Sequence, residues 1–290
     1  EQSLRKGEVG GSTPLIGSMI IDAHTHIGKL ENSPLANKPF EDIKKSLLSV
    51  MKAGRVDHAF VLANWRKKDD SDPSTKTLIK LTEKIPNLHV IGSLDILKYT
   101  KRDLKELENL IQNKKILGVK LYLGYQHFYA SDPVAQPIYK LCDKLGVPVI
   151  FHTGDTLAYY TFAKVKYAHP LAIDEVAVDF PNLKIVIAHL GNPWLMDCAE
   201  ILYRNPNVYA DLSGLFLHDG FNTPYGKMMT LKIKEMIAYI QNPKKLIFGT
   251  DWPLANMKGY IKFVRKLGFS KTDLEFVMYK TAAKLFKIKI

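Results

Sequence analysis

The sequence predicts a (β/α)8 barrel, a TIM barrel, that forms a single domain. Short apolar runs alternate with stretches in which apolar residues recur every three or four positions. This alternation of strand and helix patterns favours a parallel sheet covered by helices. Eight such runs are present, and the 290 residues suit one barrel, which typically needs about 250. A doubly wound open sheet is the alternative, but no glycine-rich phosphate fingerprint follows the first run.

The predicted strands are runs rich in valine, isoleucine, leucine and phenylalanine. They cover residues 19–24, 58–63, 89–95, 118–123, 147–152, 184–189, 207–212 and 245–251. The predicted helices cover residues 40–53, 75–84, 102–112, 136–145, 171–180, 194–204, 226–241, 259–267 and 273–286. In the first of them Ile43, Leu47 and Met51 form one stripe, which is the spacing of an amphipathic helix. Gly146 and Pro181 end two helices just before a strand, as expected for these residue types.

Residues 1–18 differ from the rest of the chain because they are rich in glycine and show no periodicity. Met19 directly precedes the first strand, as a natural initiator would. We therefore interpret residues 1–18 as a cloning leader or a disordered extension, and residues 19–290 as the folded domain.

Composition and charge narrow the class of protein. Hydrophobic residues make up 46% of the chain and charged residues 24%, which is ordinary for a globular protein with a large core. The net charge is +12, but the lysines are dispersed, so we expect a solvated surface and no nucleic-acid partner. No apolar stretch approaches the roughly 18 residues of a membrane span. Cys142 and Cys198 form no disulfide framework, so a cytoplasmic location is expected.

Histidine or aspartate stands at the end of the first, fifth, sixth and eighth predicted strands. Because the carboxyl ends of parallel strands meet at one rim of a barrel, these side chains should converge. His24 and His26 alternate along the first strand, so both point to the barrel interior. With His152 and Asp251 they offer three nitrogens and an oxygen, which suit Zn²⁺, Fe²⁺, Mn²⁺ or Ni²⁺. His189 ends the sixth strand at the same rim.

Four segments of the chain resemble the signatures of the amidohydrolase superfamily. They are Asp22-Ala23-His24-Thr25-His26, Phe151-His152-Thr153-Gly154, Ala188-His189-Leu190-Gly191 and Gly249-Thr250-Asp251-Trp252-Pro253. The chain is most similar to the amidohydrolase-related (amidohydrolase 2) branch, which includes aminocarboxymuconate-semialdehyde decarboxylase-like metal-dependent hydrolases. Segment 280–286 is similar to the closing helix of that branch, although Thr281 and Lys284 depart from its pattern.

The resemblance implies a distorted barrel and a divalent metal, usually zinc, with one ion expected rather than two. The ligands that it implies are His24, His26, His152 and Asp251. His189 would polarise the substrate or orient the metal-activated water, or it would ligate a second ion in a binuclear site. Asp251 would take the proton of that water and later give it to the leaving group. Asp22 would support the loop or a ligand from behind.

Lys120, on the fourth predicted strand, has three interpretations. The resemblance to binuclear members implies a carboxylated lysine that bridges two metals. The resemblance to mononuclear members implies an unmodified lysine that contacts an anionic substrate. The third interpretation is a lysine that extends from a strand end towards solvent. A cation near the metal would suit a substrate that carries a carboxylate.

Further candidates follow the predicted strands, where loops form the catalytic rim. Trp65 and Arg66 follow the second strand, and Tyr122 and Tyr125 follow the fourth. An aromatic-rich rim suits a flat organic substrate, and loop packing is the alternative. Asp155 follows His152 and is a candidate to support it. His58 and His89 begin strands, so we expect them at the opposite rim.

The sequence therefore predicts an enzyme, and three reactions stay open. The leading hypothesis is a metal-dependent hydrolase that opens an amide, ester or lactone bond of a small organic substrate. The alternative is a metal-dependent, non-oxidative decarboxylase of an aromatic or unsaturated acid. A metal-dependent nuclease is a third alternative, but the glutamate that TatD-like nucleases carry after the third strand has no clear counterpart here. The expected partner is a small molecule, with no membrane, and a homodimer is left open.

Overall fold

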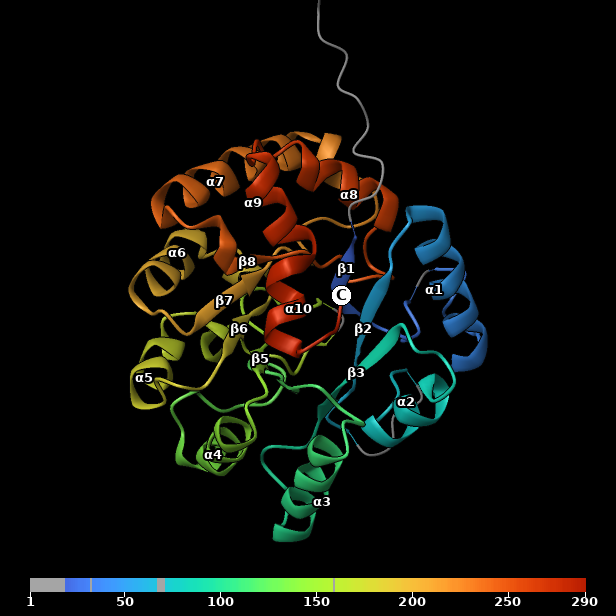
Figure 1. Ribbon diagram of the computed structural model, residues 1–290, viewed down its shortest axis with the longest axis vertical. Coiled ribbons are helices and arrows are strands. Elements are labelled where there is room, and N and C mark those ends of the chain that lie inside the picture. Colours follow the sequence, from blue (N-terminus) through green and yellow to red (C-terminus); the bar gives the residue numbers. More distant parts are fainter. Residues whose placement is uncertain (1–18, 32, 67–70, 159) are drawn as a thin grey trace, which may run out of the picture.

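The computed structural model describes residues 19–31, 33–66, 71–158 and 160–290. Eight strands, ordered β1 to β8, pair in parallel with their sequence neighbours, and helices surround them (Figure 1). This arrangement confirms the predicted single-domain (β/α)8 barrel. The predicted leader, residues 1–18, lies outside the described residues.

The strands are shorter than the apolar runs that predicted them. They are β1 Ile21–Thr25, β2 His58–Leu62, β3 Leu88–Ser93, β4 Val119–Leu121, β5 Val149–Phe151, β6 Ile185–Ile187, β7 Val208–Asp211 and β8 Leu246–Ile247. The helices are α1 Phe40–Gly54, α2 Thr75–Thr82, α3 Lys101–Gln112, α4 Gln136–Leu145, α5 Ala172–Asp179, α6 Leu195–Arg204, α7 Pro224–Ile240, α8 Met257–Arg265, α9 Lys271–Glu275 and α10 Thr281–Phe286. Within the described ranges, no helix combines the length and apolar character that crossing a membrane requires.

The barrel closes between β8 and β1 through residues that lie just beyond β8. The amide of Ala23 donates to the Phe248 carbonyl at 3.0 Å, and the amide of Asp251 donates to the His24 carbonyl at 2.8 Å. Because β5, β6 and β8 end before His152, His189 and Asp251, these three residues lie in the loops that follow the strands. Their directions are therefore set by the loop conformations and not by the strand alternation.

The final helix closes the amino-terminal end of the barrel. The predicted helix 273–286 is in the structure α9, a π-helical segment Phe276–Lys280, and α10. Figure 1 shows α10 lying across the barrel, where its apolar face joins the residues that fill the interior. The rings of Phe60 and Phe286 are 4.2 Å apart. This end is filled by apolar side chains, which leaves the carboxyl-terminal end for chemistry.

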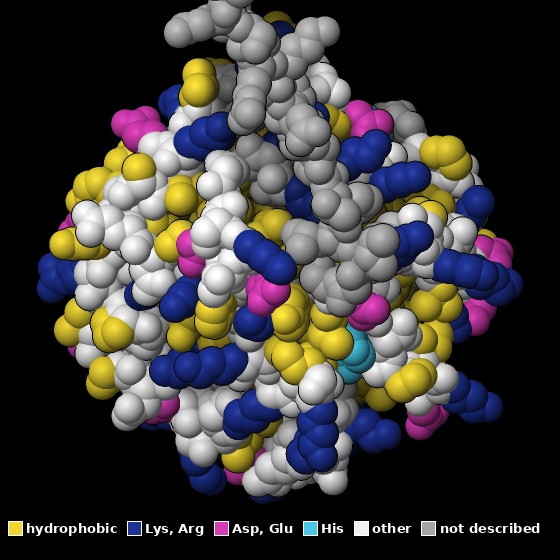
Figure 2. Space-filling model, turned by 45° about the horizontal axis from the view of Figure 1, so that its top comes forward, with side chains coloured by type: hydrophobic (Ala, Val, Ile, Leu, Met, Phe, Trp, Pro, Cys, Tyr) yellow, Lys and Arg dark blue, Asp and Glu magenta, His cyan; other side chains and the backbone are white. Residues whose placement is uncertain are grey.

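The charged surface is mixed, as the dispersed lysines predict. On the face shown in Figure 2, Lys and Arg side chains lie scattered among hydrophobic and acidic ones. At the amino-terminal end of the barrel, His58 is the first residue of β2 and His89 the second residue of β3. Nδ1 of His58 lies 3.1 Å from Nε2 of His89. These two histidines stand apart from the polar strand ends, as expected.

Candidate metal centre and substrate cavity

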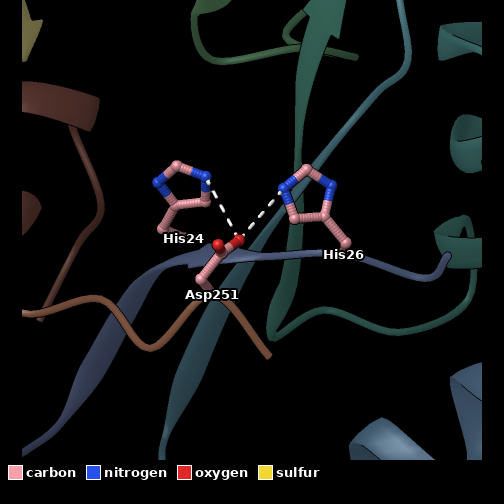
Figure 3. A group of neighbouring side chains, drawn as sticks. All are labelled: His24, His26 and Asp251. Atoms are coloured by element: carbon pink, nitrogen blue, oxygen red, sulfur yellow. Dashed lines mark ion pairs between the residues drawn. The ribbon is translucent and has the colours of Figure 1, made fainter. Parts of the chain in front are cut away.

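Donor atoms of His24, His26 and Asp251 converge at the carboxyl-terminal end of the barrel (Figure 3). His24 lies in β1 and His26 just after it, and Asp251 follows β8, the neighbour of β1 in the closed barrel. Asp251 Oδ1 is 3.7 Å from His24 Nε2 and 3.4 Å from His26 Nε2. The carboxylate points between the two rings (Figure 3). The structure thus brings three of the four predicted ligands together.

Asp22 anchors the loop that presents Asp251. Its buried carboxylate accepts hydrogen bonds from the Thr250 amide at 3.0 Å and from the Thr250 hydroxyl at 2.6 Å. It also accepts a bond from the His24 amide at 3.2 Å. Asp251 has a φ of 63°, a left-handed conformation that aspartate adopts more readily than most residues. Asp22 therefore supports the junction of β1 with the β8 loop, through backbone and hydroxyl groups.

Asp211, the last residue of β7, belongs to the site although the sequence analysis did not single it out. Its Oδ2 is 2.7 Å from His24 Nδ1, and both side chains are buried. Burial opposes ionisation, but His24, His189 and Lys120 hold the pKa of this carboxyl below its usual value. Because an ionised carboxylate only accepts hydrogen bonds, His24 Nδ1 carries the hydrogen of this bond, and Nε2 is the ring nitrogen left to face a cation. An aspartate at the end of an apolar run was the signal that could have found Asp211.

Ser213 links this pair to His189. The Ser213 hydroxyl donates to Asp211 Oδ1 at 2.5 Å, so its oxygen is left to accept a bond from His189 Nδ1 at 2.9 Å. The backbone amide of His189, a residue with a φ of 61°, donates to Asp211 Oδ1 at 2.9 Å. Burial lowers the pKa of His189 to about 4, so the ring is neutral at pH 7. His189 therefore offers the lone pair of Nε2 at the cavity that it lines.

The residues that converge here fit a divalent cation. His24 Nε2 is buried and has no hydrogen-bond partner among the described residues. Buried polar atoms are normally bonded, so this nitrogen is available to a cation. Tetrahedral ligands about 2.1 Å from zinc lie about 3.4 Å from one another, which matches the separations from Asp251 Oδ1. Imidazole and carboxylate together suit zinc, manganese or iron. The carboxylate of Asp211 behind His24 is the arrangement that orients a metal-binding histidine.

A second group of possible ligands, formed by His24, His189 and Asp211, is internally bonded. Its atoms lie close enough for a cation, but the short bond between His24 and Asp211 already uses the facing nitrogen and oxygen. The atoms of this second group are therefore already partnered with one another.

His152 is placed differently from the other predicted ligands. Its Nε2 lies 3.0 Å from the carbonyl oxygen of Asp155, to which a ring N–H donates. In the described residues it joins neither group whose donor atoms lie within 4.8 Å of one another. Its ring still borders the site, 5.0 Å from that of His189 and 4.8 Å from that of Tyr125. Asp155 thus supports His152 through its backbone carbonyl and not through its carboxylate.

Lys120 is a buried cation inside the barrel. It lies in β4, only 1% of it is exposed, and its Nζ has no hydrogen-bond partner among the described residues. Burial lowers its pKa to about 8, and the carboxylates of Asp211 and Asp251 oppose that shift, so the charged form prevails at pH 7. The ammonium group lines the cavity 5.5 Å from the ring centre of Tyr122. Such a group, with its hydrogen-bond donors unused, favours an anionic ligand.

The site opens into a cavity of about 590 Å³. On one side stand the aromatic rings that the sequence analysis placed at the rim, with Trp65 4.8 Å from Tyr122 and 5.8 Å from Tyr125. Tyr122 donates to the carbonyl of Ala63, and the Tyr125 hydroxyl accepts from the Leu157 amide. These bonds hold the rings in place, so they form a rigid wall for a flat ligand.

Arg66 lies elsewhere than predicted. It lines a separate pocket of about 230 Å³ between the loops after β2 and β3, and its guanidinium lies 5.0 Å from the ring of Trp65. Trp65 lines both spaces, so Arg66 packs against the aromatic wall from behind. A strand-end position predicts the rim but does not say to which side of a loop a side chain turns.

Comparisons with known proteins agree with this fold. A family model described as amidohydrolase matches residues 21–288. A search of curated proteins found no match. Among solved structures, the chain is similar to an uncharacterised TIM-barrel protein from Bordetella bronchiseptica, at 20% identity and a TM-score of 0.71, over 93% of this chain and 98% of that one.

Two further solved structures carry names of enzymes. One is a probable 2-pyrone-4,6-dicarboxylic acid hydrolase from Acinetobacter baumannii with citric acid bound, at 18% identity and a TM-score of 0.65, over 93% of this chain and 99% of that one. The other is a 5-carboxyvanillate decarboxylase from Novosphingobium aromaticivorans complexed with manganese and a nitrobenzoic acid, at 14% identity and a TM-score of 0.68. That match covers 94% of this chain and 97% of the other. At these identities the likeness shows the fold.

Proposed function

Since this chain belongs to the amidohydrolase family, we propose that it is a metal-dependent decarboxylase of a small, planar carboxylic acid. One observation carries the proposal: the buried ammonium of Lys120, with no partner among the described residues, shares a cavity with a metal-type donor group and an aromatic wall. A carboxylate attached to a flat ring matches all three features. The manganese-bound carboxyvanillate decarboxylase of the same fold supports the assignment.

His24 Nε2, His26 Nε2 and Asp251 Oδ1 would hold the cation, and His152 would join them through Nδ1, the atom that its bond to Asp155 leaves available. Manganese or zinc bound there would act as a Lewis acid that polarises substrate oxygens. Asp22 and Asp211 would keep the donors in place, as their hydrogen bonds indicate.

Lys120 would bind the carboxylate that leaves. Of its three interpretations we propose the unmodified, substrate-binding lysine. A carboxylated lysine bridges two metals, and the second donor group here is already satisfied by the bond between His24 and Asp211. A lysine directed to solvent does not agree with 1% exposure. Trp65, Tyr122 and Tyr125 would bind the face of the ring.

Asp251 would move the proton. Burial would raise its pKa, but the surrounding histidines and Lys120 hold that pKa below its usual value, so it begins as a carboxylate. It first takes a proton from a substrate hydroxyl or from water and then gives it to the ring carbon that carries the carboxylate. The bond from that carbon to the carboxyl carbon then breaks. The electron pair of this bond stays with the ring, and CO₂ leaves. His189 Nε2, which has a lone pair, would accept a hydrogen bond from the substrate hydroxyl and so orient it.

Hydrolysis of a lactone or ester is the second candidate. Asp251, ionised as in the decarboxylase, would take a proton from a water molecule that attacks the substrate. The probable pyrone-dicarboxylic acid hydrolase of the same fold also acts, by its name, on a carboxylate-bearing ring. A nuclease is not proposed, because the cavity walls are aromatic and apolar and the basic side chains are dispersed.

The test is product analysis with the metal-loaded protein. Hydroxybenzoates, carboxylated methoxyphenols and carboxylated lactones would be incubated in water enriched in ¹⁸O. We expect CO₂ release and a product without the label, together with loss of that release in Lys120→Met. A labelled ring-opened acid without CO₂ would establish the hydrolase instead.

A further inference from the structure

Beyond the carboxylate and the ring, the cavity has a third region that the proposed reaction does not use. Leucine and phenylalanine side chains from the loops after β1, β7 and β8 line it: Leu30, Leu215, Phe216, Leu217 and Leu254. These loops are neighbours around the rim, because β7, β8 and β1 are consecutive in the closed barrel. We call the four leucines among these residues the aliphatic wall.

Most of the aliphatic wall comes from other strands than the aromatic wall does. Trp65 follows β2, and Tyr122 and Tyr125 follow β4, on the other part of the ring of strands. Lys120 also comes from β4, so it fixes an anion on the aromatic side. A ligand held there by its carboxylate and ring must direct its remaining substituents towards the aliphatic wall.

The volume leaves room for such substituents. A single ring with one carboxyl group has about ten heavy atoms, and even at a water molecule's share of about 30 Å³ each it occupies no more than about 300 Å³. The cavity measures about 590 Å³, so about half of it is left. Leu217 lines the cavity and is 61% exposed, so its side chain is accessible to a ligand.

We infer that the substrate carries an apolar chain opposite its carboxylate, and that the aliphatic wall selects it. The substrate class is thus an amphipathic, alkyl- or alkenyl-substituted aromatic acid rather than a bare hydroxybenzoate. This inference rests on the proposed function, in which Lys120 binds the carboxylate end of the substrate. Leu217 and Leu30 are the specificity-determining residues, since their side chains stand at the loops and can change without altering a strand.

The experiment is calorimetric binding of a series of 4-alkylbenzoates, from methyl to hexyl, to the manganese-loaded protein. Burial of each methylene predicts that Kd falls about threefold to fourfold per added carbon. Leu217→Ser and Leu30→Ser should flatten this dependence on chain length. Leu231→Ser is the matched control, because Leu231 is a 70% exposed leucine of α7 that does not line the cavity.

Two results would overturn the inference: an affinity that is absent or constant along the series, or a chain-length dependence that survives in both wall variants. Decarboxylation is measured separately on acids without the chain. Release of CO₂ with a flat binding series would contradict only the apolar chain, and a steep series without CO₂ release would contradict only the proposed reaction.

Discussion

Asp211 Oδ2 lies 2.7 Å from His24 Nδ1, so the last residue of β7 fixes the orientation and the tautomer of a histidine in β1. His24 Nε2 is left buried and without a partner in the described structure, beside Asp251 Oδ1. This relationship connects two strands that are far apart in sequence, and it prepares a metal-binding atom before any metal arrives.

Removing the carboxylate behind His24 should weaken metal binding. In Asp211→Ala we expect the affinity for zinc, measured by competition with a chelator, to fall about 10- to 100-fold, the usual effect of losing such a partner. Asp179→Asn, at the exposed end of α5, is the control and should bind as the wild type does. An unchanged affinity in Asp211→Ala would show that the pair has no role in holding the ion.

Ser213→Ala should lower turnover without removing metal. The hydroxyl accepts from His189 Nδ1, and losing one hydrogen bond of about 1 kcal/mol should reduce kcat roughly fivefold to tenfold. Metal content, measured by mass spectrometry of the same samples, should stay at the wild-type value. If kcat is unaffected, the tautomer of His189 is set by a group other than the Ser213 hydroxyl.

Gly214 leaves room for the reacting groups. A Cβ at this position would lie 2.7 Å from His189 Nδ1 and 2.9 Å from Asp251 Oδ2, and its φ is +65°. Gly214→Ala should therefore abolish most activity and destabilise the fold by about 1–2 kcal/mol. Gly268→Ala is a matched control, because Gly268 has a φ of +93° and nothing within 4 Å of the added Cβ. It should lose comparable stability in a denaturant titration and keep full activity.

The histidine pair at the amino-terminal end of the barrel should make stability depend on pH. Burial, and then His58, lower the pKa of His89 to about 4, below the ordinary value near 6.5 that the unfolded chain keeps. Between these values the unfolded state binds a proton that the folded state does not, so this contribution is complete above pH 6.5 and is lost as pH falls towards 4. The Tm of His89→Gln should therefore fall less steeply than that of the wild type across this window. Parallel curves for the two proteins would contradict the assignment.

The fold could be predicted from the sequence because strand and helix patterns depend on local periodicity. Each of the eight apolar runs contains a strand of the barrel. The rim position of His24, His26 and Asp251 followed as well, since parallel strands all end on one side. The position of Lys120 on a predicted strand made it a candidate site residue. Only the packing shows that its Nζ is buried without a hydrogen-bond partner in the described part of the chain.

Other parts of the site depend on loop geometry that periodicity does not encode. His189 is turned by a φ of 61°, and His152 is held by a carbonyl three residues further on. Arg66 faces a neighbouring pocket because the loop after β2 carries it past the aromatic wall. Asp211 ended an apolar run like the others, but its partner in β1 is visible only once the barrel is closed.

A divalent ion held by His24, His26 and Asp251 is central to the proposed chemistry. The decisive measurement is the metal content per chain of wild type, His26→Ala and His58→Ala, each purified with the same added zinc and desalted. We predict about one ion per chain in wild type and in His58→Ala, whose histidine lies at the other end of the barrel, and a large loss in His26→Ala. Full metal content in His26→Ala, or none in the wild type, would contradict it.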